Sequence, residues 1–444
     1  MALRMLVISA GPITDAMSGP AIRATELARV LRSHGDVVLA GTAPERSGGE
    51  SRADVTFRHQ DPRSLRRHVE RADVIVSQPT WPLISHWARR AGSRLIVDLY
   101  DPEPLELLAH RANDGGAGAR HASLDRLLVG VWAQLTADRV LNSLANGHAF
   151  ICASEKQRDL WIGAMLAEGL LRQRTYAQDP TLRSVIDVVP FGVPAEAAPT
   201  VTGAIRRALP EVGTDDVVLW NGGIWNWLDP VTAVRAVARL AGAGRRVRLV
   251  FMGASDDVNG RAATLAARRA ATDLGVDGLV LFNDVWVPYN DRGGWLADAA
   301  VAISSHHDHL ETRYAFRTRL LDCFWSGLPI VCTAGDHLAS LVEINGLGAT
   351  APAGDEVGLA RALEQVLDRG RAYYAPQLAT AAAEHRWERV AEPLVRLATA
   401  EPPSQRLGHG LPAARHPGRA ARTSAFLLAR STLNHVGLHH WPTL

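Results

Sequence analysis

The residues best suited to chemistry lie in the segment 304–331, where a polar stretch leads into a helical pattern. Arg317 and Arg319 stand near the expected start of that helix. A cation is unfavourable beside the positive end of a helix dipole unless an anion binds there, so these side chains favour a phosphate ligand. Glu311 and Asp322 belong to the same segment, and either carboxylate can accept hydrogen bonds from sugar or ribose hydroxyls. A surface network of salt bridges is the alternative.

Four neighbouring residues, His306, His307, Asp308 and His309, raise the question of a metal site. Contiguous side chains cannot readily all face one ion, and the helical spacings His-Glu-x-x-His and Glu-x-x-His do not occur here. We therefore expect no metal ligands in this segment. A polar loop beside a ligand and a purely structural role both remain open.

A glycine-containing loop follows the expected strand 217–220. Gly222 and Gly223 can form a nest of backbone amides for a phosphate or sugar oxygen. Asp229, followed by proline, predicts a helix start with a capping carboxylate. Trp225 lies in the loop between them, where a tryptophan either lines a cleft or packs between domains.

In the first half of the chain, two loops carry groups that favour ligand binding. Gly19 lies in a Ser-Gly-Pro loop between the first strand and the first helix, where backbone amides can approach a ligand. Asp98 and Asp101 stand at and just beyond the end of the expected strand 95–99, where a carboxylate can orient a hydroxyl group or stabilise a developing cation. The alternative for the loop at Gly19 is an ordinary connection between strand and helix. The alternative for the two carboxylates is capping of the following helix.

Several common signatures are missing from the sequence. The pattern G-x-G-x-x-G is not found after the first strand, which disfavours a dinucleotide cofactor. The P-loop pattern G-x-x-x-x-G-K-[ST] and the serine-hydrolase elbow G-x-S-x-G do not occur either.

The elements that must position these residues alternate between short apolar runs and longer stretches of helical period, which predicts βα units on parallel sheets. The pattern restarts after a linker near 191–202, so we predict an α/β protein of two doubly wound, Rossmann-like domains. Strands are expected at 4–9, 37–40, 74–77, 95–99, 149–153, 186–189, 217–220, 247–252, 279–282, 300–304 and 329–333. Closing helices are expected at 355–367 and 386–397.

Composition sets the broad class. With 444 residues, 47% hydrophobic residues and a net charge of +2, the chain has material for two domain cores and no charge excess for binding nucleic acid. Three cysteines in apolar surroundings predict neither a disulfide framework nor a zinc site, which fits a reducing cytosol. No signal peptide or membrane-spanning run is recognised, so we expect a cytoplasmic protein, with peripheral membrane contact as an open alternative.

These motifs, in this order, resemble those of GT-B glycosyltransferases of the large retaining family 4, over roughly residues 1–400. The resemblance rests on the loop at Gly19, the linker 188–193, the glycine turn at Gly222 and the helix-to-strand stretch 321–331. It implies two Rossmann-like domains facing across a cleft and a metal-independent enzyme without a cofactor. Such an enzyme moves a sugar with retention from a nucleotide-diphosphate sugar to a hydroxyl acceptor such as a polysaccharide, glycolipid or natural product.

The sequence departs from the family pattern at two points. The family has two acidic residues eight positions apart; Asp322 takes the second position, for the ribose, while the first falls on Tyr314, so Glu311 would have to meet the sugar in its place. The family also has an arginine and a lysine after the first strand of the second domain. Neither is found here, and Arg317 and Arg319 would supply that charge from the facing helix.

The resemblance implies a role for each segment of the chain. Residues 1–195 form the expected acceptor domain, with Gly19 and Asp98 binding the acceptor and Asp101 acting in catalysis beside Glu311. Residues 196–385 form the expected donor domain, residues 386–400 a closing helix that packs back on the first domain, and residues 401–444 a tail rich in proline, arginine and histidine. A non-catalytic sugar-nucleotide binder, or an oxidoreductase or epimerase on the same scaffold, are the competing functions.

Overall fold

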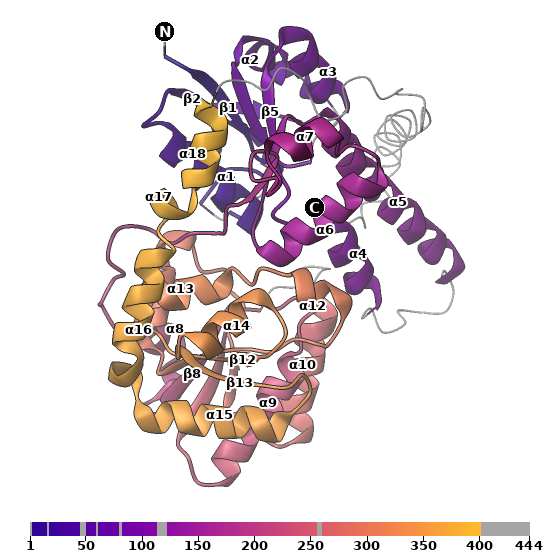
Figure 1. Ribbon diagram of the computed structural model, residues 1–444. Coiled ribbons are helices and arrows are strands. Elements are labelled where there is room, and N and C mark those ends of the chain that lie inside the picture. Colours follow the sequence, from indigo (N-terminus) through magenta and orange to yellow (C-terminus); the bar gives the residue numbers. More distant parts are fainter. Residues whose placement is uncertain are drawn as a thin grey trace. The chain divides into compact units, whose positions relative to one another are not determined.

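The computed structural model describes residues 2–15, 17–44, 50–58, 61–79, 82–112, 122–254 and 260–400, with the backbone alone for 110–112 and 122–129. The chain divides into two compact units (Figure 1). Among the described residues, the first unit takes in those up to 104, 122–190 and 387–400, and the second takes in 105–112 and those between 191 and 386. The expected tail, 401–444, lies outside the described residues.

The first unit is built on a sheet of seven parallel strands in the order β3-β2-β1-β4-β5-β6-β7. Its inner strands are continuous apolar runs because helices cover both faces of the sheet; every residue of β4 and β5 is buried. The chain reverses its direction of winding between β1 and β4. The strands are β1 (Arg4–Ile8), β2 (Asp36–Thr42), β3 (Val55–Phe57), β4 (Val74–Ser77), β5 (Arg94–Asp98), β6 (Ala149–Cys152) and β7 (Ile186–Val188).

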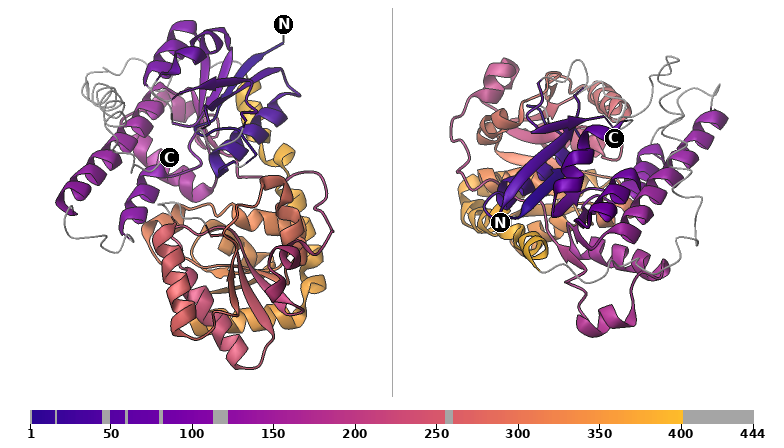
Figure 2. Two further views of the ribbon diagram at one scale, coloured as in Figure 1. Left: turned by 180° about the vertical axis from the view of Figure 1, so that it is seen from behind. Right: turned by 90° about the horizontal axis from the view of Figure 1, so that it is seen from above.

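The helices of the first unit cover the faces of its sheet (Figure 2). The first of them buries Ala24, Leu27, Ala28 and Leu31, the residues whose spacing of three and four places them on one face. The helices of the first unit are α1 (Gly19–Leu31), α2 (Arg66–Arg71), α3 (Pro82–Ala91), α5 (Ala122–Asn146), α6 (Glu155–Ala167) and α7 (Gln173–Gln178). The helix α4 (Glu103–Ala112) also lies in this part of the chain, but from Leu105 onward it is assigned to the second unit.

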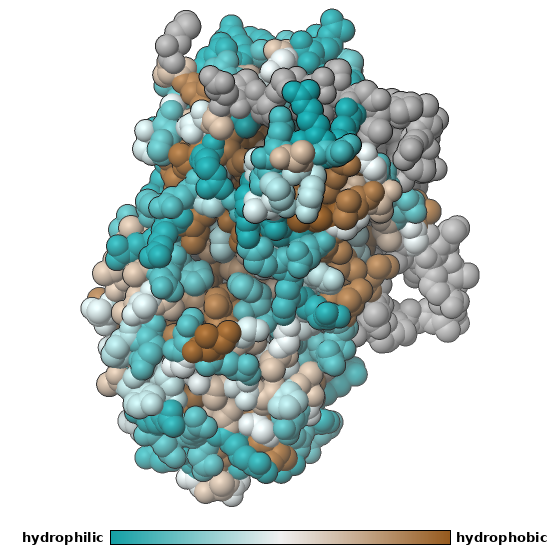
Figure 3. Space-filling model, viewed as in Figure 1, coloured by the Kyte–Doolittle hydropathy of each residue, from teal (hydrophilic) through white to brown (hydrophobic). Residues whose placement is uncertain are grey.

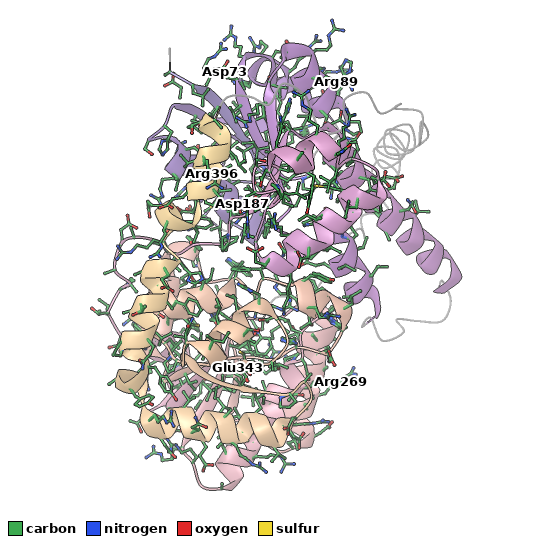
Figure 4. All side chains as sticks on the ribbon, viewed as in Figure 1. Asp73, Arg89, Asp187, Arg269, Glu343 and Arg396 are labelled. Carbon is green, nitrogen blue, oxygen red and sulfur yellow. The ribbon has the colours of Figure 1, made fainter. Side chains whose placement is uncertain are left out.

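Two short helices near the C-terminus complete the first unit: α17 (Trp387–Val390) and α18 (Glu392–Thr399). The sequence had predicted one helix over 386–397, but Pro393 lacks the N–H that a continuous helix needs and is accepted in a first turn, so a new helix begins at Glu392. Arg396 donates a hydrogen bond to Asp187 of β7, and Figure 4 shows the two labelled side chains side by side. Arg94 Nη1 donates to the carbonyl oxygen of Ala400 across 2.7 Å.

The second unit repeats the plan with six parallel strands in the order β10-β9-β8-β11-β12-β13, and Figure 2 shows each sheet between layers of helices. The strands are β8 (Asp216–Gly223), β9 (Val247–Gly253), β10 (Val280–Phe282), β11 (Val301–Ser304), β12 (Ile330–Thr333) and β13 (Gly348–Ala351). The helices are α8 (Ala204–Ala208), α9 (Pro230–Gly242), α10 (Arg261–Asp273), α11 (Arg292–Asp298), α12 (Leu310–Tyr314), α13 (Arg319–Ser326), α14 (His337–Ile344), α15 (Glu356–Arg369) and α16 (Arg371–Glu384).

Arg371 fastens three helices of the second unit together. Its guanidinium donates to carbonyl oxygens at the end of α11, among them those of Leu296 (2.9 Å) and Ala299 (3.0 Å), and to those of Ser326 (2.5 Å) and Gly327 (3.2 Å) at the end of α13. The last carbonyls of a helix lack partners within the helix and carry partial negative charge, so a cation there satisfies both needs.

The two doubly wound α/β domains predicted from the sequence are confirmed, with differences at particular elements. The strands β3 and β13 and the helix α16 were not predicted. β13 reads Gly-Ala-Thr-Ala, which lacks the large β-branched run that marks a buried strand.

Candidate active site

The polar residues of the segment 304–331 meet the glycine loop at one edge of the second sheet. β8 and β11 are neighbours, and the chain winds away from them through β9 and β10 on one side and through β12 and β13 on the other. In doubly wound folds, ligands bind at the carboxyl ends of strands at such a switch point. The loops after β8 and β11 are joined by a bridge between Leu228 and His306 and by a hydrogen bond from Asp229 N to Ser305 O of 3.0 Å.

Gly222 and Gly223, the last residues of β8, bring the backbone close to Arg319. Gly222 has a φ of +103°, which residues with a side chain rarely adopt, and a Cβ there would lie 3.8 Å from the Arg319 guanidinium carbon. The carbonyl oxygen of Gly223 accepts hydrogen bonds from Arg319 Nη2 (2.9 Å) and Trp220 Nε1 (3.3 Å). The predicted glycine turn and the predicted cation therefore lie together.

Arg319 is held in place with one donor left over. Its guanidinium carbon lies 5.5 Å from the ring centroid of Trp220, and its main-chain oxygen accepts a hydrogen bond of 2.6 Å from Asn221 Nδ2. The Nη1 atom is buried and finds no hydrogen-bond partner within the described residues. Burial, and to a smaller extent the charge of Arg317, lower the pKa of Arg319. A bound anion would satisfy Nη1 and offset both effects.

Glu311, in α12, forms a buried ion pair. Arg317 Nη2 donates to Glu311 Oε2 across 2.7 Å, and the two side chains are 7% and 0% exposed. Arg317 Nε also lies 3.9 Å from Asp336 Oδ2. The sequence suggested Arg317 as a phosphate ligand, whereas the structure places its charge between two carboxylates. Glu311 Oε1 has no hydrogen-bond partner in the part of the chain that the structure describes, so one acceptor is left for a ligand.

The histidines beside this pair are arranged as neutral hydrogen-bonding groups. His306 Nδ1 lies 3.2 Å from the carbonyl oxygen of His307, and His306 Nε2 lies 3.6 Å from Asp336 Oδ2. Burial lowers the pKa of His306 to about 4, and burial also lowers the pKa of His309. Among the described residues, no group of three or more His, Cys, Asp or Glu side chains is placed to hold a metal ion.

Asp322 lies one turn after Arg319 on α13, with its carboxylate at an ion pair that the sequence did not predict. Arg292 Nε donates to Asp322 Oδ1 across 2.9 Å. Burial raises the pKa of Asp322, and the charge and hydrogen bond of Arg292 act in the opposite direction. The carboxylate keeps part of its surface accessible, so the second oxygen can meet a ligand.

Trp225 stacks on Trp227 in the loop after β8. Their ring centroids are 5.6 Å apart and the ring planes differ by 8°. Both side chains are half-buried, and a Cβ on Gly223 would touch the Trp225 ring at 3.2 Å. Trp225 therefore forms one wall of the glycine turn with a surface still open to a ligand.

In the first unit, Gly19 begins α1 at the carboxyl edge of the sheet, beside the switch point between β1 and β4. The loop that leads to it is braced by Gln78, which accepts a hydrogen bond from Ala10 N (3.1 Å) and donates to Pro20 O (3.4 Å). A Cβ on Gly19 would lie 3.7 Å from the hydroxyl of Tyr100.

Asp98 and Asp101, predicted as partners, lie in different surroundings. Both carboxylate oxygens of Asp98 accept from Arg23, at 2.6 and 3.0 Å, and this pair is 4% and 0% exposed. Arg23 also donates to the carbonyl oxygens of Val189 (2.8 Å) and Pro190 (3.0 Å). Asp98 thus differs from the predicted acceptor ligand: Arg23 engages both of its oxygens, and the pair holds β5, α1 and the end of β7 together. Asp101 is only partly buried.

Comparison with known proteins decides the nature of the second unit. Residues 215–369, which contain the loops after β8, β11 and β12, match the family model described as glycosyl transferases group 1. This unit is a group 1 glycosyltransferase domain. Among curated protein sequences, none matches the chain.

Solved structures extend the likeness of this glycosyltransferase beyond the matched domain. Anabaena HepE in complex with UDP and glucose is similar with a TM-score of 0.64 and 13% identity, over 89% of this chain and 98% of that one. WaaG, a glycosyltransferase involved in lipopolysaccharide biosynthesis, gives a TM-score of 0.61 and 15% identity, over 90% and 100%. Sucrose-phosphate synthase from Thermosynechococcus elongatus gives 0.57 and 15%, over 89% and 98%. The chain therefore has the GT-B fold expected from its motifs.

The glycosyltransferase domain also holds residues that the sequence analysis missed. Asp336 follows β12 as the cap of α14, accepting a hydrogen bond of 2.7 Å from Ala339 N, and it faces both Arg317 and His306. Its place just after a strand of the central sheet was a signal that could have found it. Arg292 had no comparable signal, because it begins the helix α11 and does not follow directly after a strand.

Figure 3 shows hydrophilic and weakly hydrophobic residues interspersed over the face in view of the glycosyltransferase domain, with hydrophobic residues in small groups. Within the described ranges, no helix is both long and apolar enough to cross a bilayer.

Proposed function

We propose that this glycosyltransferase moves a sugar from a nucleoside diphosphate sugar to a hydroxyl acceptor, with retention of configuration and without a metal ion. The observation that carries the proposal is Arg319, whose buried Nη1 lacks a partner within the described residues and whose Nη2 is fixed at the Gly222–Gly223 turn. A diphosphate would supply the anion that this cation and the start of α13 need.

The placement of the diphosphate at Arg319 determines which parts of the donor the nearby carboxylates would meet. Asp322, one helical turn beyond Arg319, would accept hydrogen bonds from the ribose, and Glu311 would meet the sugar through Oε1. Arg317 would hold the Glu311 carboxylate in its orientation. Structures of HepE with UDP and with UDP-glucose support a nucleotide donor of this class.

The main contribution of the protein to this reaction would be to stabilise the charges that develop as the bond to the diphosphate breaks. When the bond between the anomeric carbon and the diphosphate breaks, negative charge grows on the leaving diphosphate and positive charge on the carbon. Arg319 and the amides at Gly222 and Gly223 would stabilise the former. The acceptor hydroxyl attacks the same carbon and its proton passes to the departing diphosphate. In the first unit, the loop at Gly19 and the carboxylate of Asp101 would receive the acceptor.

The test is turnover with a panel of UDP-, GDP-, ADP- and dTDP-sugars, measured as released nucleoside diphosphate, in the presence and absence of EDTA. We expect release with at least one donor, unaffected by EDTA, and NMR of the product should show the donor's anomeric configuration. Arg319→Met should lower kcat/KM by about a hundredfold or more, while Arg313→Met, which removes an exposed arginine of α12, should leave it unchanged.

A non-catalytic sugar-nucleotide binder is the second candidate, favoured by the missing arginine and lysine after β8. It predicts saturable binding of a nucleoside diphosphate with no release from any donor. Loss of activity with EDTA would overturn metal independence, and inversion of the product would overturn retention.

A further inference from the structure

Arg292, the first residue of α11, is a buried arginine whose contacts reach α13 and the turn just before its own helix. It is 6% exposed. Its Nε donates to Asp322 Oδ1 across 2.9 Å and its Nη1 to the carbonyl oxygen of Tyr289 across 2.6 Å. A cation at the start of a helix opposes the helix dipole, so the carboxylate of Asp322 is the group that makes this position acceptable.

Two aromatic rings restrict the guanidinium to one orientation. Its central carbon lies 3.5 Å from the ring centroid of Tyr289 and 4.6 Å from that of Trp325. Trp325 is fixed in turn by a hydrogen bond of 2.7 Å from its Nε1 to the carbonyl oxygen of Glu196. A planar cation stacked in this way cannot rotate without losing both ring contacts.

The fixed guanidinium determines which part of Asp322 is available. Oδ1 is engaged by Arg292, and within the described residues no hydrogen bond reaches Oδ2. The Asp322 side chain is 29% exposed, while that of Arg292 is 8% exposed. The carboxylate therefore presents one oxygen outward, in one orientation, one turn away from Arg319.

We propose that Arg292 is a positioning residue for nucleotide recognition: by clamping Oδ1, it aims Asp322 Oδ2 at the ribose hydroxyls and so makes the site select ribonucleotides over deoxyribonucleotides. This inference rests on the proposed function. Arg292 itself touches no ligand; it acts through Asp322, whose charged oxygen accepts hydrogen bonds from the hydroxyl groups.

The selectivity has an expected size. Hydrogen bonds from neutral hydroxyls to a charged acceptor are worth roughly a tenfold to hundredfold change in affinity. Removing the clamp frees the carboxylate to rotate and to take water or a neighbouring donor, so the ribose loses this advantage while the diphosphate contacts remain. A residue with a purely structural role would weaken ribo- and dideoxyribonucleotides equally.

The experiment measures affinities by calorimetry for uridine, guanosine and adenosine diphosphates and for their 2′,3′-dideoxy counterparts. The wild type should bind at least one ribonucleotide about tenfold or more tightly than its dideoxy form. The ratio should fall to about threefold or less in Arg292→Met and in Asp322→Asn, through loss of ribonucleotide affinity alone. Arg292→Lys keeps the charge without the planar fork and should give an intermediate ratio.

Arg268→Met is the matched control. Arg268 also pairs with a carboxylate, Asp284 at 2.5 Å, and stacks on an aromatic ring, Phe282 at 4.1 Å, but it is part of α10 and well exposed. Its variant should keep the full ratio. An undiminished ratio in folded Arg292→Met or Arg292→Lys would overturn the inference and leave the proposed function standing. A wild type that binds none of the diphosphates would contradict the proposed function itself.

Discussion

Arg317 Nη2 donates to Glu311 Oε2 across 2.7 Å inside the glycosyltransferase domain, and water reaches almost no part of either side chain. This pair sits on a segment of only seven residues, so α12 and the start of α13 are tied together by it. Its burial makes it costly to break from one side, because the remaining charge has no solvent.

We expect Arg317→Met to lower the free energy of unfolding by about 3 to 5 kcal/mol, and the double variant with Glu311→Met to regain part of that loss. Urea unfolding of the single and double variants measures both. Arg29→Met provides the control, since Arg29 pairs with Glu26 at 2.8 Å while 43% exposed and should cost less than about 1 kcal/mol. Equal losses for the two single arginine variants would contradict the buried-pair account.

His306 predicts a specific pH dependence of stability. Because burial lowers its pKa from 6.5 to about 4, the unfolded chain binds a proton in that window that the folded chain does not. Stability therefore falls as the pH is lowered from about 6.5 toward 4. Between pH 7 and pH 5 we expect the wild type to lose about 2 kcal/mol more than His306→Asn does.

Urea unfolding at the two pH values compares the two proteins. Arg317, Glu311 and Asp336 also face this position and remain in both proteins, so the difference isolates His306. Parallel pH profiles for wild type and variant would show that His306 titrates normally.

The sequence predicted those features whose pattern lies within a short run of residues, and it did not predict contacts between residues far apart in the chain. β4 was predicted with its observed bounds because Val74–Ser77 is an uninterrupted buried run, and the glycine turn and Arg319 were predicted as parts of one site. The partners of the charged residues were not predictable. Arg23 is 75 positions from Asp98, and Arg292 is 30 positions from Asp322, and no local pattern connects residues at such separations.

Arg317 illustrates the same limit within a short segment. Its position near a helix start indicated a cation for phosphate, yet its carboxylate partner, Glu311, was only six positions away and equally visible in the sequence. Composition cannot decide whether an arginine meets a ligand or a neighbouring acid. The fold brings Glu311 of α12 against Arg317 just before α13, and this contact determines that Arg317 meets a neighbouring acid.

Arg371 should matter for the stability of the second unit. We expect Arg371→Met to lower the free energy of unfolding by about 2 to 4 kcal/mol, because it leaves several helix-end carbonyls without donors. Arg371→Lys should restore only part of this, since an ammonium has fewer donors and no fork. Arg369→Met, which removes a nearby exposed arginine, should change stability by less than about 1 kcal/mol.

Chemical denaturation followed by tryptophan fluorescence measures these changes. A loss for Arg371→Met no larger than that for Arg369→Met would contradict the role assigned to the carbonyl contacts.

The three cysteines should be unreactive in the folded protein. All are buried and free, burial raises the pKa of Cys152 to about 12, and burial also raises the pKa of Cys323 and Cys332. Since the thiolate is the reactive form, a disulfide reagent at pH 8 should modify none of them until urea is added, when all three should react. Rapid modification of any thiol without denaturant would be the opposite result.

The proposed function depends on Arg319 and the glycine turn binding the diphosphate of a nucleotide. Calorimetric titration of UDP and GDP into wild type, Arg319→Met and Arg313→Met tests it most directly. We predict saturable binding by the wild type and by Arg313→Met, and affinity at least about thirtyfold weaker in Arg319→Met. Wild-type affinity in a folded Arg319→Met protein would contradict the account.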